Sequence, residues 1–303
     1  MLYNRGEKQI LAEIAIEPGR TQARQLATGP GWTVEEVVCS CGPGDRPYPE
    51  QHERVSIAIV TGGTFQYRGS GSNGREVMTP GSILLGSPGQ AFECGHEHGA
   101  GDRCLSFGFA PHYFETIAAG SLVTNLRRVF RSLRLPPLPT LSPVVAEAWS
   151  ALARSSEVAW EDFAIRVAAR TLDADRDIEP DASAVSAAAI ARVTRAVRLI
   201  EERPGDSLTI VSLAREAGLS PFHFLRTFEK LTGVTPHQYL RRARLRAAAA
   251  ALLIDGPARI LDVALDAGFG DVSNFNHAFR AEFGVSPKAY RRVARTSQVR
   301  LTS

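Results

Sequence analysis

The feature that most constrains this chain is a helical pattern that occurs twice toward its C-terminal end, about fifty positions apart. Small and aromatic residues recur in the same order in both copies. They are Ala214, Ala217, Gly218, Phe224, Phe228, Gly233, Pro236 and Tyr239 in the first, and Ala264, Ala267, Gly268, Phe275, Phe279, Gly284, Pro287 and Tyr290 in the second. The offset is 50 before the first pair of aromatic residues and 51 from there on, so the second copy has one extra residue in its turn. We therefore expect one helical unit to be folded twice.

Each copy has the pattern of a short helix, a tight turn and a longer helix. Closely spaced alanines let a second helix approach, and Gly218 can take the positive φ that ends a helix. Ser220 is then a natural N-cap, with Pro221 at the first helical position. Phe224 and Phe228 make an apolar stripe along the longer helix. The pattern predicts a helix-turn-helix, whose second helix is the one that enters the DNA major groove.

The residues that point away from these apolar stripes are the candidates for contact with DNA. We assign to this group Phe222, Leu225, Arg226 and Lys230 of the first copy, and Ser273, Asn276, His277 and Arg280 of the second. Asn pairs with adenine edges and Arg with guanine edges or phosphates, whereas His is a shorter donor that is mostly neutral near pH 7. The second helix-turn-helix is therefore expected to be the weaker of the two.

The most specific signal lies in the second copy, in Gly268–Phe279, Phe283–Pro287 and the pair Tyr290-Arg291. With these motifs, the stretch from about Ala188 to Arg295 resembles the DNA-binding domain of the AraC/XylS transcription regulators. The resemblance implies two helix-turn-helix units joined by a long helix and placed in successive major grooves on one face of the duplex.

The joining helix is expected from Tyr239 through Leu253, a stretch rich in Arg, Leu and Ala, with a stop at residues 255–257. The chain departs from the usual family pattern at His277, where arginine is common, and at Leu225, an apolar residue at an outward position. Both departures leave the preferred bases open.

Charge divides the chain in the same way. Residues 187–303 hold 18 Lys and Arg against 10 Asp and Glu, whereas residues 1–186 hold 17 against 22. The basic part is the one expected to meet phosphate, although any single arginine has a solvated helix surface as its alternative. There is no apolar run of the roughly 20 residues that cross a membrane. A polar N-terminus and four cysteines without a small-scaffold spacing favour the cytoplasm.

At 303 residues and 44% hydrophobic content the chain has room for about two domains, and we expect an α+β two-domain protein. Residues 1–173 are assigned to a first domain for effector sensing and dimerisation. Residues 174–187, which are acidic and interrupted by proline, are assigned to a linker, and residues 188–303 to the DNA-binding domain. One or two helices within Ser142–Leu172 are expected to pack on the first domain, with a dimer seam as the alternative.

Short strand patterns bounded by turn residues fill the first domain, at Val34–Cys39, Val55–Val60, Thr64–Tyr67, Ser82–Leu85 and Cys104–Phe109. Such a series favours a barrel or a sandwich. The turn-strand-turn of Thr79–Leu85 and Ser87–Gly89 resembles that of the cupin-like sensor domains that many AraC/XylS members carry. The mouth of such a barrel is the expected effector pocket. We assign to it four residues that would otherwise be core: Trp32, His52, Phe65 and Tyr67.

A group of cysteines and histidines has two interpretations. Residues two positions apart point to the same face of an extended strand, so Cys94, His96 and His98 would share one face. Cys39 and Cys41 are related in the same way. With Cys104 nearby, Cys94 and His96 are candidates for a soft-metal or thiol site. Several glycines favour a loop here instead. We therefore expect ordinary loop or barrel residues, with no metal and no cofactor.

Two hypotheses of function follow. The first is a DNA-binding transcription regulator without enzyme activity, whose partners are double-stranded promoter DNA and a small-molecule effector. The second is a metal-dependent cupin enzyme with a DNA-binding tail. No Ser-His-Asp arrangement or phosphate loop is recognisable in the sequence, which favours the first. A homodimer and a contact with RNA polymerase stay open, and no membrane partner is expected.

Overall fold

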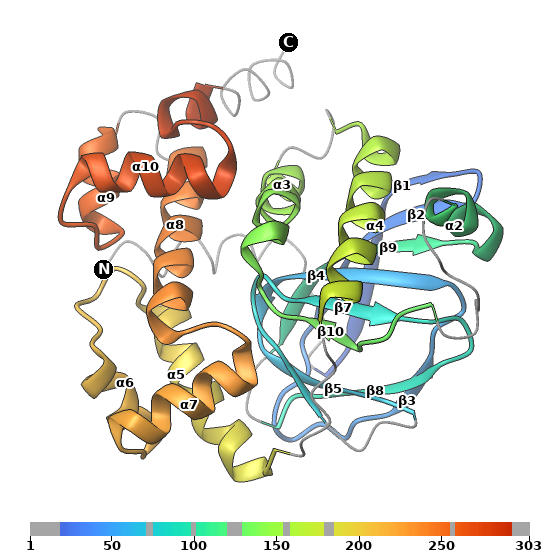
Figure 1. The fold of residues 1–303 in the computed structure, drawn as a ribbon, viewed down its shortest axis with the longest axis horizontal. Coiled ribbons are helices and arrows are strands. Elements are labelled where there is room, and N and C mark those ends of the chain that lie inside the picture. The colour runs from blue at the N-terminus through green and yellow to red at the C-terminus, as the bar shows by residue number, and fades with distance from the viewer. Residues whose placement is uncertain are drawn as a thin grey trace. The chain divides into compact units, whose positions relative to one another are not determined.

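The computed structural model describes residues 19–70, 75–97, 101–119, 129–153, 158–178, 185–254 and 258–292 (Figure 1). These residues divide into two compact units. The first takes in the described residues up to Thr194 together with Lys230–Val234, and the second takes in Arg195–Glu229 and the described residues from Thr235 onward. The N-terminal part is rich in strands and the C-terminal part is helical, so the predicted α+β division is confirmed at this level.

Two antiparallel sheets form the strand-rich part. One has six strands in the order β1-β2-β9-β4-β7-β10, and the other has four in the order β3-β8-β5-β6. The strands are β1 Thr21–Gly29, β2 Trp32–Cys39, β3 Pro49–Gln51, β4 Val55–Gly63, β5 Phe65–Gly69, β6 Glu76–Met78, β7 Ile83–Gly86, β8 Ala91–Gly95, β9 Asp102–Phe109 and β10 Arg134–Leu135.

The five predicted strands are confirmed as β2, β4, β5, β7 and β9, with ends that differ by a few residues. Strand β1 escaped the sequence analysis because it lies at a sheet edge and is largely exposed, so it lacks an apolar face. Of the two expectations for the region around Cys94, loop or barrel residues, the structure has strands: Cys94 lies in β8, and β9 begins at Asp102.

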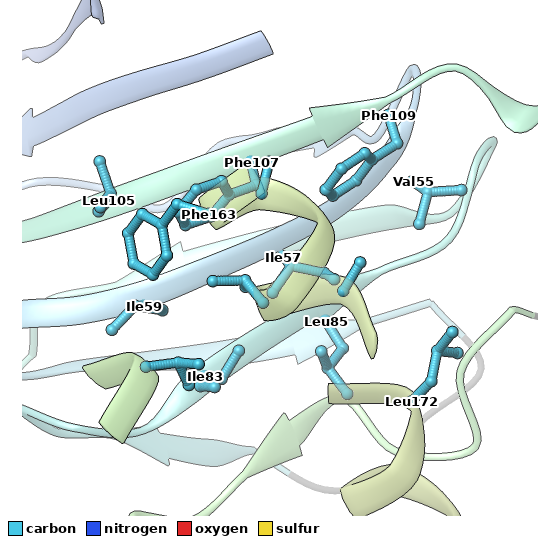
Figure 2. Packing of buried hydrophobic residues seen from close by; sticks show 14 of the residues in the cluster. Val55, Ile57, Ile59, Ile83, Leu85, Leu105, Phe107, Phe109, Phe163 and Leu172 are labelled. Atoms are coloured by element: carbon cyan, nitrogen blue, oxygen red, sulfur yellow. The ribbon is translucent and has the colours of Figure 1, made fainter. Parts of the chain in front are cut away.

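The core of the first unit lies between the six-stranded sheet and two helices, α3 Ser142–Ala153 and α4 Trp160–Asp177. Figure 2 shows Ile57 and Phe107 of the sheet with Phe163 of α4 among them. The rings of Phe107 and Phe163 meet edge to face, with centroids 5.4 Å apart. The prediction that the helices within 142–172 pack on the first domain is thereby confirmed. Helix α2 Pro111–Ala118 and the short 3₁₀-helix η2 Pro139–Leu141 complete this part.

The predicted linker needs a correction at its start. Helix α4 continues to Asp177, and both Ala174 and Asp175 are buried. The Asp175 carboxylate accepts hydrogen bonds from the backbone N–H groups of Arg131 at 2.8 Å and Ser132 at 3.0 Å. The segment around Asp175 is acidic, so its sequence predicted a solvated linker. The partners of Asp175 are more than forty residues away in the sequence and could not be recognised from it. Residues 179–184 of the predicted linker lie outside the described residues.

The rest of the described chain contains α5 Ala187–Glu202, α6 Ile210–Ala217, α7 Pro221–Thr232, α8 Pro236–Ile254, α9 Ile260–Asp266 and α10 Val272–Phe283, and residues 287–292 are also helical. The joining helix predicted over 239–253 is confirmed as α8, and its predicted stop at 255–257 lies outside the described residues. Among the helices described, none has the length and apolar character that crossing a membrane requires.

The sequence repeat is also a repeat of side-chain packing. In the first copy, ring centroids of Phe224 and Phe228 lie 5.4 Å apart, and Tyr239 meets Phe228 edge to face at 5.7 Å. The second copy has the same pattern, with 5.5 Å for each equivalent pair, Phe275 with Phe279 and Phe279 with Tyr290. These rings form the buried centre of each unit, which is why the aromatic spacing is shared.

Candidate functional site

The first helix-turn-helix is α6, its turn and α7. Thr209 and Ser212 form a capping box at the start of α6: the Thr209 side chain accepts a hydrogen bond from the backbone N–H of Ser212, and the Ser212 side chain accepts one from the backbone N–H of Thr209. Gly218 ends α6 in the left-handed conformation at φ +64°, a conformation that glycine adopts without steric cost. Ser220 then accepts a hydrogen bond from the backbone N–H of His223 in the first turn of α7. The start and direction of α7 are therefore set locally.

The outward face of α7 carries the four residues predicted for it. Phe222 is 65% exposed and Leu225 is 38% exposed, while Arg226 and Lys230 are also exposed. The Arg226 guanidinium lies 5.8 Å from the centre of the Phe222 ring, one helical turn away. An apolar pair next to a cation is suited to thymine methyl groups and guanine edges in a major groove.

The second helix-turn-helix is α9, its turn and α10. The extra residue falls in the turn, where Phe269 is buried against Phe275 with ring centroids 5.2 Å apart. Asp271 caps α10 by accepting hydrogen bonds from the backbone N–H groups of Ser273 and Asn274, at 3.0 and 2.9 Å. The hydrogen bond from Asn274, and to a smaller extent that from Ser273, lowers the pKa of the Asp271 carboxyl.

The outward face of α10 carries Ser273, Asn276, His277 and Arg280, and all four are exposed. Phe275 and Phe279 point the other way, into the core of the second copy. The face therefore offers an amide, a hydroxyl, an imidazole and a guanidinium, groups that bond to base edges and phosphates. It has fewer cations than α7, as expected from His277.

The arginines of the joining helix have mainly structural contacts. The Arg242 side chain is buried and lies 3.7 Å from the Glu282 carboxylate, and Arg246 pairs with Glu201. Arg244 donates to the backbone carbonyls of Pro204 and Asp206, each at 2.9 Å. Part of the positive charge of the C-terminal part therefore holds α8 in place. For these three arginines, neither a contact with phosphate nor the alternative of a solvated helix surface describes the main role.

The four predicted effector residues do not gather at one place. His52 Nε2 lies 2.8 Å from the Tyr67 hydroxyl, and the His52 ring stacks on Phe92 at 4.2 Å. Phe65 is buried in the same cluster as Tyr67. Trp32 belongs instead to the other core, between the six-stranded sheet and the helices. Sequence alone could not separate them, because the two clusters lie on opposite faces of the same strands, β4, β7 and β9.

Burial of His52 makes a prediction about pH. Desolvation lowers the pKa of His52 to about 4 in the folded protein, below its ordinary value of 6.5. The unfolded chain therefore binds more protons than the folded one between these values, and stability is lost as pH falls from 6.5 to 4. We expect a loss of about 3 kcal/mol from this group.

Urea unfolding followed by tryptophan fluorescence between pH 7 and 4 measures this effect. His52→Gln should flatten the pH dependence of the free energy of unfolding over that window. His112→Gln, at an exposed histidine of α2, is the matched control and should keep the wild-type dependence. Parallel curves for wild type and His52→Gln would contradict the burial effect.

The cysteine and histidine candidates are also regrouped by the structure. His96 is buried and its Nε2 lies 2.6 Å from Asp102 Oδ2, while the buried Cys104 thiol lies 3.6 Å from Asp102 Oδ1. Cys94 is half-buried in β8, and His98 lies outside the described residues. The potential ligand atoms of Cys39, Cys41 and His96 lie within 4.8 Å of one another. The sequence signal for this group was the one-residue separation of Cys39 from Cys41 and of Cys94 from His96. The sequence analysis did not identify Asp102 as a partner of His96.

Comparison with known proteins gives a family match in the C-terminal part. A helix-turn-helix domain family matches residues 213–293. The chain is similar to the transcriptional activator NphR of Rhodococcus sp., with 41% identity over 104 residues that cover 33% of this chain and 30% of NphR. It is similar to the transposon Tn10 TetD protein of Escherichia coli, with 38% identity over 93 residues that cover 31% of this chain and 67% of TetD.

Among solved structures, an AraC-type transcriptional regulator from Chromobacterium violaceum is 26% identical, covers 36% of this chain and 96% of its own, and has a TM-score of 0.34. The chain spans about a third of the length of the curated relatives it matches first. The family match at residues 213–293 falls on the part that carries the two helix-turn-helix copies with their repeated aromatic packing. With that domain, the chain belongs to the AraC/XylS family of transcriptional regulators.

Proposed function

We propose that the chain binds double-stranded promoter DNA through its C-terminal part and regulates transcription there. The observation that carries the proposal is the pair of helix-turn-helix units, each of which buries one face of its second helix and exposes the other. The similarity to NphR, a transcriptional activator, supports the same activity. A regulator of this kind would act in the cytoplasm.

Helix α8 supports simultaneous use of both units. Its first turns pack on the first copy through Tyr239, and its last turns pack on the second through Leu252. A helix of 19 residues spans about 28 Å, which is of the order of the roughly 34 Å between successive major grooves on one face of a duplex. We propose that α7 and α10 read two such grooves, with α7 the stronger of the two.

For the strand-rich part we propose a cupin-like domain that binds a small-molecule effector. The buried polar pair of His52 and Tyr67 supports it, since such groups fix the orientation of a ligand in an otherwise apolar site. Because α4 runs to Asp177, we place the boundary between the domains after residue 178 and before α5. The cupin-enzyme alternative is not favoured, because the similar protein NphR is a transcriptional activator. A second copy of this chain, in a homodimer, and RNA polymerase are further proposed partners.

The proposal is tested by selecting duplexes from a random pool with the full chain and measuring their affinity by fluorescence anisotropy at fixed salt. We expect Arg226→Ala to weaken binding to the selected site by about 5- to 150-fold, or about 1 to 3 kcal/mol, and to relax one base position. The reason is that Arg226 projects from the exposed face of α7.

Arg198→Ala is the control, because Arg198 pairs with Glu202 on the surface of α5 and its removal changes the net charge equally. It should weaken binding much less. An equal loss in both variants would show a general charge effect in place of base contact. Failure to enrich any duplex would overturn the proposed function itself.

A further inference from the structure

A second site of distinctive chemistry lies in the strand-rich unit, separate from the recognition helices. Cys39 ends β2, Cys41 follows two residues later, and His96 comes directly after β8. All three side chains are buried, and their potential ligand atoms lie within 4.8 Å of one another. Among the described residues, this is the only such group of three.

The sheet register explains why residues from two distant segments meet. Cys39 is paired with Asp102 across β2 and β9, and the backbone N–H of Gly101 donates to the Cys41 carbonyl at 2.8 Å. Gly101 has φ +77°, and a Cβ at this position would lie only 2.6 Å from the Cys39 carbonyl oxygen. The glycine therefore lets the start of β9 approach the Cys39–Cys41 segment closely.

Asp102 orients the histidine. Its Oδ2 accepts a hydrogen bond from His96 Nε2 at 2.6 Å, which leaves Nδ1 as the ring nitrogen available to a ligand. A histidine that binds a metal usually donates its other ring N–H to a carboxylate in this manner. Two thiolates and an imidazole form the donor set that soft or borderline ions such as Zn²⁺ prefer.

We propose that Cys39, Cys41 and His96 bind a thiophilic metal ion such as Zn²⁺, with Asp102 as the residue that positions His96. The three ligands line a pocket whose wall also includes Thr21, Asp45, Tyr48, Glu50 and Cys94. Three protein ligands leave one position of a tetrahedral ion for a water or a small ligand from this pocket. The site replaces the set Cys94, His96 and Cys104 considered from sequence, since Cys104 faces Asp102 instead.

The proposal is independent of DNA binding, and its test measures metal directly. The reduced full chain is stripped with a chelator and titrated with Zn²⁺ in competition with a chromophoric chelator. Wild type should bind about one ion per chain. Cys39→Ser, Cys41→Ser and His96→Gln should each lose most of the affinity, and Asp102→Asn should lose about 10- to 100-fold.

Cys104→Ser is the matched control, because Cys104 is a buried cysteine outside the pocket lining, and it should bind Zn²⁺ like wild type. Circular dichroism confirms that each variant is folded. A second measurement on wild type covers the case in which the ligand variants fail to fold: Co²⁺ bound at the site should give a thiolate-to-cobalt charge-transfer band. Wild type that binds no Zn²⁺, a Co²⁺ complex without that band, or equal loss of affinity in Cys104→Ser and Cys39→Ser would overturn the proposal.

Discussion

Replacing Phe279 with alanine is expected to destabilise the C-terminal helical unit by about 3 to 5 kcal/mol and to abolish DNA binding by the second helix-turn-helix. The Phe279 side chain is fully buried. Its ring lies 5.5 Å from Phe275, 4.4 Å from Phe283 and 5.5 Å from Tyr290, measured between centroids. Truncation therefore removes the ring on which three others pack and leaves a cavity that α10 cannot close without shifting.

The three tryptophans make this measurable in the full chain. Trp32, Trp149 and Trp160 all lie in the strand-rich unit, so their fluorescence follows that unit in urea, whereas far-UV circular dichroism follows mainly the helices. Phe279→Ala should move the helical transition to lower urea and leave the fluorescence transition in place. A joint shift of both transitions would show that the two units unfold together.

Phe222→Ala is the matched control, since the same side chain is removed from an exposed position of α7. Its effect on the free energy of unfolding should stay within about 0.5 kcal/mol. It should nevertheless weaken DNA binding, because Phe222 lies on the proposed recognition face. The two variants thus separate the structural phenylalanines of the repeat from the exposed one.

Asp175→Ala is expected to destabilise the strand-rich unit by about 2 to 5 kcal/mol. The buried carboxylate is the hydrogen-bond acceptor for two backbone N–H groups, those of Arg131 and Ser132. Each buried donor that is left without a partner costs about 1 to 3 kcal/mol. Asp175→Asn keeps one carbonyl oxygen and should cost less than the alanine variant.

Tryptophan fluorescence in urea measures this loss, because Trp149 and Trp160 belong to the same unit as Asp175. Asp173→Ala is the control: Asp173 lies on the same helix, and its exposed carboxylate is 3.8 Å from Arg176. A surface pair of this kind is worth roughly 0 to 1 kcal/mol, so the control should unfold nearly like wild type. If Asp173→Ala and Asp175→Ala unfolded at the same urea concentration, the buried acceptor would have no special role.

The helical part could be predicted closely because its determinants are local. Gly218 and Gly284 end their helices at positive φ, and Asp271 caps α10 through backbone groups two and three residues away. The stripes of Phe224 and Phe228, and of Phe275 and Phe279, follow from the spacing of four residues on a helix. These contacts lie within a few turns of one another along the chain, so the sequence displays them directly.

The strand-rich part could be predicted only in outline. The alternation in β2, β4 and β9 was recognisable because each strand buries apolar residues, but β1 at the sheet edge has no such face. The helices of 142–172 were expected, yet the end of α4 was assigned to a linker. The composition around Asp175 is that of a solvated segment, and only the fold brings it against residues 131 and 132.

By itself, the sequence determined the two helix-turn-helix units, the faces their second helices expose, and the family to which the chain belongs. The tertiary structure alone decided which buried polar groups meet: His52 with Tyr67, and His96 with Asp102, Cys39 and Cys41. The physical reason is the range of the contacts. Helical turns relate residues three or four positions apart, whereas strand register relates Cys39 to Asp102 across the sheet, and no local pattern encodes that pairing.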